Sequence, residues 1–127
     1  MKILGVDFGE RKIGLAMADS KIAEPFVVLR FKKEEEAIEK ILKLIEKEGI
    51  NLVVVGISEG KSAQKTKVFI KKLQEKTKIE IKSHDETLST YEAQRLAIEA
   101  GLKRVKRKNL EDAFAATVML QDYLGTF

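Results

Sequence analysis

The chain has 127 residues, 44% of them hydrophobic and 35% charged, so we expect one hydrophobic core and a single domain over residues 1–127. The absence of cysteine excludes disulfides and a cysteine zinc site, and the single histidine, His84, excludes a multi-histidine metal cage. No apolar run approaches the roughly 20 residues that span a bilayer. The N-terminus meets a charged turn too soon for a signal peptide. We therefore expect a cytoplasmic protein that binds no membrane.

The net charge of +4 is a mild excess, but its distribution is uneven. Five cations gather within six positions before the last predicted helix: Lys103, Arg104, Lys106, Arg107 and Lys108. Such a stretch is typical of contact with nucleic-acid phosphates. A solvated, flexible loop is the structural alternative.

The first third of the chain has the pattern of three strands. We expect strands at 3–8, 13–18 and 26–31, with a polar hairpin turn at 9–12 and a loop that includes Pro25. Short connections between successive strands predict an antiparallel meander. Gly14 would leave space on one face of the second strand.

The pattern then changes to the period of a helix. Apolar residues spaced as on a helix face follow three acidic residues at 34–36, and Gly49 is placed to end this helix in the left-handed conformation. The β-branched run at 52–55 predicts a central strand that is buried on both faces.

In the second half of the chain, helix and strand patterns continue to alternate. A polar stretch at 58–66 leads to a helix that ends near Lys76, and a fifth strand follows at 79–82. The capping box at 89–92 opens a helix that Gly101 ends, and Asn109 is placed to cap a last helix. That helix would turn four residues inward: Ala113, Ala116, Leu120 and Leu124. The order is βββαβαβα, with the final helical part divided in two. It predicts an α/β fold with one five-stranded mixed sheet and helices on both faces.

Several acids occur where elements are expected to end or begin. Asp7 ends the first strand, Asp85 and Glu86 follow the fifth, and Asp112 falls in the expected first turn of the last helix. If the two strands are parallel, their acids meet at one edge of the sheet. Carboxylates brought together favour a hard divalent ion, Mg²⁺ or Mn²⁺, and such ions promote phosphodiester cleavage. Each acid also has a structural alternative as a turn or capping residue, and for His84 we expect a structural role.

Several segments resemble the YqgF family of pre-ribosomal-RNA nucleases, also described as Holliday-junction-resolvase-like. The opening segment 3–16 matches the family's strand, acid, glycine, basic pair and second strand, and Asp112–Ala116 matches its last motif. Segments 53–56 and 85–90 match between them, so the resemblance covers nearly the whole chain. It implies a ribonuclease-H-like fold with catalytic, metal-binding acids at Asp7, Glu86 and Asp112.

The resemblance also implies a metal-dependent nuclease on structured nucleic acid. We expect RNA rather than DNA, most of all the precursor of 16S ribosomal RNA, with Holliday-junction cleavage as the alternative. Thr87 stands where the family usually has arginine, and Arg11 or Lys12 would have to supply that charge. The full set of expected nucleic-acid contacts is Arg11, Lys12, Lys61, Lys65, Lys103, Arg104, Lys106, Arg107 and Lys108.

Two other functions stay open from the sequence. A phosphate-cradling fragment of the actin and sugar-kinase type would begin in the same way, but it needs a second such hairpin, which this chain lacks. A non-catalytic RNA-binding or ribosome-assembly protein would use the same basic residues, and the change at Thr87 motivates this alternative.

Both a monomer and a homodimer are compatible with the sequence, although a resolvase needs two sites and hence a symmetric dimer.

Overall fold

The computed structural model describes residues 1–57, 61–85 and 104–125, and for 61–62 and 104–112 it describes the backbone alone. Five strands form one sheet in the order β3-β2-β1-β4-β5. Their bounds are β1 Ile3–Phe8, β2 Lys12–Ala18, β3 Ala23–Arg30, β4 Leu52–Ile57 and β5 Glu80–Asp85. β2 is antiparallel to β1 and β3, whereas β4 and β5 run parallel to β1. The predicted meander and mixed sheet are both confirmed.

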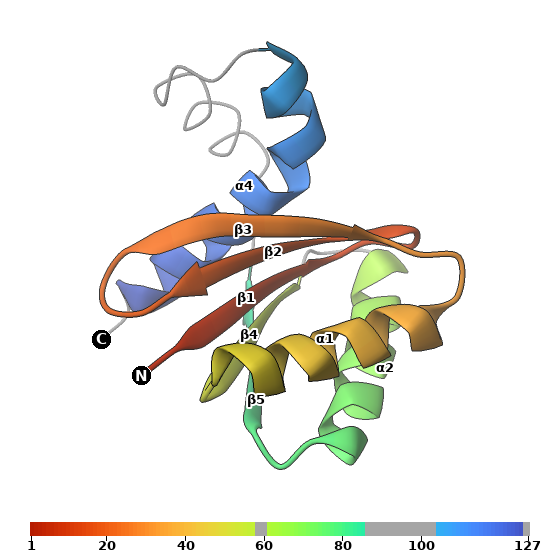
Figure 1. Ribbon diagram of the computed structural model, residues 1–127. Coiled ribbons are helices and arrows are strands. Elements are labelled where there is room, and N and C mark those ends of the chain that lie inside the picture. The colour runs from red at the N-terminus through yellow and green to blue at the C-terminus, as the bar shows by residue number, and fades with distance from the viewer. Residues whose placement is uncertain (58–60, 86–103, 126–127) are drawn as a thin grey trace.

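Helices cover the two faces of this sheet. α1 (Glu34–Glu48) and α2 (Lys61–Lys76) lie on one face, and α4 (Arg104–Leu124) lies on the other (Figure 1). Helices on both faces were predicted, and this is confirmed. Gly49 ends α1 with φ 67°, as its position indicated. In the described ranges, none of the helices is both long and apolar enough to cross a membrane.

The larger part of the core lies between the sheet and the pair α1 and α2. Alternate residues of the central strands, such as Leu4 and Val6, point to this side and are fully buried. Phe8, at the end of β1, stacks on Phe69 of α2 with ring centroids 4.5 Å apart. This contact fixes the carboxyl end of β1 against α2.

The second part of the core lies under α4 and depends on a close approach of helix and sheet. Ile3 and Val54 meet Ala116 and Leu120 there. A Cβ atom added to Gly5 would lie 2.9 Å from the Leu120 Cβ, so a residue without a side chain is needed at this crossing. Because α4 contacts the sheet at Gly5, this contact determines the distance between α4 and the residues of β1 that follow Gly5.

The third strand is longer than the sequence predicted. β3 begins at Ala23 and includes Pro25, which we had expected in a loop. β3 is an edge strand, where proline is tolerated because one side of the strand needs no hydrogen bonds. A register shift at Leu15/Ala16 lies opposite Pro25.

Two of the other predicted boundaries also need correction, and a third cannot be compared. α2 begins at Lys61, within the predicted polar stretch, because Thr66 is buried and shares the inward face with Phe69, Ile70 and Leu73. β5 runs to Asp85 rather than 82, since an edge strand tolerates the polar segment after Ile81. The helix expected from Ser89 to Gly101 lies outside the described residues.

The last helix begins at Arg104, so Asn109 is not its cap and Asp112 is not in its first turn. Most of the basic stretch is therefore helical and not a loop. Lys and Arg are good helix formers, and this preference outweighs the capping preference of a single Asn. Of the four residues predicted to face inward, Ala113, Ala116 and Leu120 are fully buried and Leu124 is partly buried.

Candidate active site

Asp7 lies at the carboxyl end of β1, between two glycines. Its partner on β2 is Gly14, and its partner on β4 is Gly56. Residues in register on neighbouring strands point to the same face, so backbone alone lies on either side of the Asp7 carboxylate. The neighbours of Asp7 in the row Gly14, Asp7 and Gly56 thus have no side chains. Gly14 lies on the same face of the sheet as Asp7.

The face on which Asp7 lies is the face that α4 covers. Side chains alternate along a strand, and both Ile3 and Gly5 contact α4 residues. His84 is in register with Gly56 and belongs to the same row, roughly 10 Å from Asp7 in backbone position. Asp85 follows His84 on β5 and falls on the opposite face.

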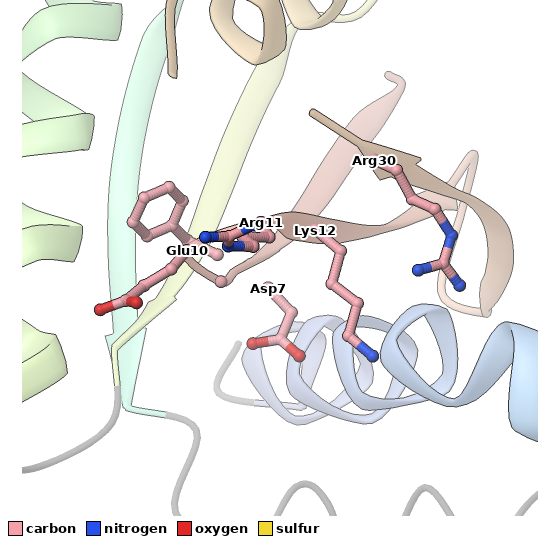
Figure 2. Close-up of a pocket in the computed structure, with 7 residues that line it drawn as sticks. Asp7, Glu10, Arg11, Lys12 and Arg30 are labelled. Atoms are coloured by element: carbon pink, nitrogen blue, oxygen red, sulfur yellow. The ribbon is translucent and has the colours of Figure 1, made fainter. Parts of the chain in front are cut away.

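Asp7 lines a pocket of about 520 Å³ at the β1–β2 turn, together with Phe8, Gly9, Glu10, Arg11, Lys12 and Arg30. In Figure 2 the side chains of Lys12 and Arg30 extend to the same side as the Asp7 carboxylate, and Glu10 points away from it. Lys12 and Arg30 are exposed, and Asp7 is partly buried. The pocket therefore brings the Asp7 carboxylate together with cations, as a site for a phosphate group and a metal ion would require.

Gly9 makes the turn beside this pocket possible. A Cβ atom at this position would lie 2.6 Å from the carbonyl oxygen of Lys12. Such a contact with backbone cannot be relieved by moving a side chain, so the hairpin that carries Arg11 and Lys12 past Asp7 requires glycine here.

Glu10 forms an ion pair with Lys65 of α2. The hydrogen bond and the charge of Lys65, aided by Arg11, hold the pKa of the Glu10 carboxyl below its ordinary value. Lys65 was predicted to contact nucleic acid. In this structure its ammonium is bound to a carboxylate near the turn, and its contact with nucleic acid stays a prediction.

His84 joins β5 to α4. Its Nε2 atom lies 2.7 Å from the Asp122 Oδ2 atom, and its ring meets the edge of Tyr123 at a centroid distance of 5.6 Å. The His84 side chain is 17% exposed. Through these contacts His84 links β5 to α4.

α4 runs back along β1, from the carboxyl end of the strand toward its start. At the far end, Gln121 accepts a hydrogen bond from the Ala23 N–H and donates one to the Lys21 carbonyl, at 2.9 and 2.8 Å. Asp112 precedes Ala116 by four residues, which is about one helical turn toward the Asp7 end of the sheet.

The structure describes the predicted site residues to different extents. Asp7, Arg11 and Lys12 come together in the pocket, whereas Glu86 and Lys103 lie outside the described residues. Only the backbone of Lys61, Asp112 and the cations at 104–108 is described, in α2 and α4. Arg30 was not predicted. The strand that carries Arg30 was predicted, but its register against β2 was not.

The surroundings of Asp7 fit a divalent ion. The carboxylate is a hard oxygen donor, and neither residue in register beside it carries a side chain that would compete for the ion. Within residues 1–57, 63–85 and 113–125, whose side chains are described, no group of three His, Cys, Asp or Glu side chains is placed to hold a metal. The side chains of the predicted ligands Glu86 and Asp112 are not among those described.

Comparison with known proteins places the chain in a family. The family model described as "RuvX: Holliday junction resolvase" matches residues 1–126. The chain belongs to the RuvX family. RuvX is the YqgF family of the sequence resemblance, which is thereby confirmed. The chain is accordingly a nuclease, a hydrolase of phosphodiester bonds, and the actin and sugar-kinase alternative is wrong.

Curated relatives cover nearly the full length of the chain. A protein of Halothermothrix orenii named "Putative pre-16S rRNA nuclease" is 41% identical over 98% of this chain and 95% of its own. A protein of the same name from Clostridium acetobutylicum is 37% identical over 99% of both chains.

Solved structures show the same fold at low identity. RuvC of T. thermophilus in complex with a Holliday junction substrate has a TM-score of 0.68 at 15% identity, covering 99% of this chain and 96% of its own. The fowlpox virus Holliday junction resolvase has a TM-score of 0.64 at 12% identity over the whole of both chains. The ribonuclease-H-like fold that was predicted is confirmed.

Proposed function

We propose that the chain is a divalent-metal nuclease in which Asp7, Glu86 and Asp112 together hold Mg²⁺ or Mn²⁺. The observation that carries this proposal is the place of Asp7: a carboxylate between two glycines, at the carboxyl ends of parallel strands, in a pocket lined by cations. The direction of α4, which brings position 112 toward this end, supports the choice of Asp112. When bound, such an ion lowers the pKa of a water and stabilises the leaving oxygen of a phosphodiester.

The residues of the chain then have separate tasks. Asp7 supplies an oxygen ligand, and the flanking Gly14 and Gly56 keep side chains away from the space beside it. Arg11 and Lys12 line the same pocket, where their charges offset the negative charge of a nucleic-acid phosphate. They would supply the cation that Thr87 lacks.

For the substrate we favour the precursor of 16S ribosomal RNA over DNA. The curated relatives at 37–41% identity carry this activity in their names. Processing of such a precursor would place the protein in the cytoplasm. The basic residues at 104–108 would contribute further phosphate contacts from the first turns of α4.

The test is cleavage of a labelled 16S precursor RNA with Mg²⁺ or Mn²⁺. We expect cleavage by the wild type that is abolished by EDTA and lost in Asp7→Asn. Asp19→Asn is the matched control, because Asp19 is an exposed carboxylate beyond the opposite end of the sheet. It should cleave as the wild type does. Absence of cleavage with either metal, in folded protein that still binds the RNA, would contradict the proposal and favour a non-catalytic binding protein.

Cleavage of Holliday junctions is the second candidate function, favoured by the description of the family model. Symmetric cutting of a junction needs two active sites and hence a dimer. A synthetic four-way DNA junction, incubated under the same conditions, separates the two candidates. Paired cuts in the junction, together with a dimer mass in light scattering, would select DNA as the substrate.

A further inference from the structure

Two cations face each other across the strands beside Asp7. Lys12 of β2 is directly in register with Arg30 of β3. Both side chains are exposed, and both line the pocket that contains Asp7. Figure 2 shows them extending to the same side as the Asp7 carboxylate.

The two residues of this pair carry like charges. Like charges directly opposite each other on neighbouring strands destabilise a sheet. Arg30 forms no ion pair within the part of the chain that the structure describes. An exposed cation at the rim of the Asp7 pocket with no ion pair in the described part of the chain is available to an anionic ligand, and Arg30 is such a cation.

The spacing of the pair suits a nucleic-acid backbone. Arg30 lies two strands from β1 and two residues farther along than Asp7, a backbone separation of roughly 12 Å. Phosphates of one strand advance about 3.4 Å per nucleotide along a duplex axis. A cation at this distance from Asp7 therefore meets a phosphate within a few nucleotides of the one at Asp7.

We propose that Lys12 and Arg30 form a phosphate-binding pair, which holds the nucleic-acid strand as it leaves the Asp7 pocket across β2 toward β3. Because β3 is the edge of the sheet, no further strand lies beyond it in the described fold. This inference rests on the proposed function for the identity of the strand, and it adds Arg30 to the binding residues. The ligand chemistry is the phosphodiester backbone, which RNA and DNA share.

The test is salt-dependent binding of a fluorescein-labelled 16S precursor RNA and of a four-way DNA junction, both in the Asp7→Asn background. We compare Arg30→Gln with Arg30→Lys and with Lys40→Gln, which removes an exposed charge from α1 on the other face of the sheet. The slope of log affinity against log salt should fall by about 0.7–0.9 for Arg30→Gln. Affinity at low salt should fall roughly threefold to tenfold. Arg30→Lys keeps the positive charge, so its slope should equal that of the Asp7→Asn protein without a further substitution.

Equal slopes for Arg30→Gln and Lys40→Gln on both probes, with unchanged melting temperatures, would overturn the pair. A lower slope on either probe supports it, and the probe that is affected identifies RNA or DNA as the ligand. Binding is measured here without cleavage. If this assay shows that Arg30 contributes to nucleic-acid binding, the proposed phosphate-binding pair remains supported even if the cleavage test of the proposed function fails.

Discussion

Asp7 lies between Gly14 and Gly56, and the space beside its carboxylate depends on both. A methyl group at position 56 would enter the row of Asp7 and displace a group bound there. We expect Gly56→Ala to lower kcat on a cleavable substrate by roughly tenfold to hundredfold, as misplacement of about 1 Å does in other enzymes. Steady-state kinetics would measure this, with circular dichroism as the check on folding. Unchanged kcat in folded protein would refute the role of the glycine row.

Gly5 lies on the same face of β1 as Asp7, but its lack of a side chain serves the packing of α4. An added Cβ would lie 2.9 Å from the Leu120 Cβ and 3.1 Å from its Cδ2, so Gly5→Ala overpacks the contact between β1 and α4. Overpacking of this kind costs about 1–3 kcal/mol. Urea denaturation should show the lower stability. A midpoint equal to that of the wild type would mean that α4 can move away from the sheet at no cost.

The Glu10–Lys65 pair gives a pH dependence of known sign. Because Lys65 lowers the pKa of Glu10 in the folded state, the pair stabilises the fold above the unfolded pKa of the carboxyl. This contribution is lost as the pH falls through the folded pKa. We expect Glu10→Gln to lower the melting temperature slightly at pH 7, with the difference vanishing below the folded pKa. A difference that persists or grows in acid would contradict this assignment.

At the scale of elements, the contact between His84 and Asp122 ties α4 to the edge strand β5. Asp122 is 71% exposed, so the hydrogen bond is partly open to water and its contribution is modest. We expect Asp122→Ala to cost about 1 kcal/mol of unfolding free energy. Glu39→Ala, an exposed substitution on α1, should lie within roughly 0.5 kcal/mol of the wild type. Equal stabilities would show that β5 and α4 are held together without this bond.

The elements themselves follow largely from the sequence, and the errors have physical causes. Burial pattern and glycine caps predicted α1 and the central strands, because local sequence and tertiary packing agree there. The edge strands β3 and β5 were predicted too short, since a strand with one free side tolerates proline and polar residues. The start of α4 was predicted too late because a capping residue, Asn109, also occurs inside a helix.

At the scale of the molecule, Asp7 was predictable because its strand and its place at the carboxyl end follow from the first eight residues. Arg30 was not. Ala18 of β2 pairs with Ala23 of β3, and a regular hairpin without a bulge would then pair Lys12 with Leu29. In the structure Lys12 pairs with Arg30 instead. The register shift at Leu15/Ala16 brings Arg30 into place, and a slip of one residue exchanges the faces of a strand. Such an irregularity has no clear local signal in the sequence.

The two faces of the sheet have different tasks in this account. α1 and α2 bury the larger core on one side, whereas α4 packs on the other side at Gly5 and approaches the row of Asp7. Metal binding, phosphate contacts and the acid of α4 would all belong to this second side. We propose that Asp7 holds a divalent ion there.

The most direct measurement of this claim is anomalous diffraction at the manganese edge from crystals of the wild-type protein soaked in Mn²⁺. We expect an anomalous peak within ligand distance of the Asp7 carboxylate, about 2–2.3 Å. The peak should disappear in crystals of Asp7→Asn and remain in Asp19→Asn. No peak at Asp7 in well-diffracting soaked crystals, or a peak that survives Asp7→Asn, would show that Asp7 does not hold a divalent ion.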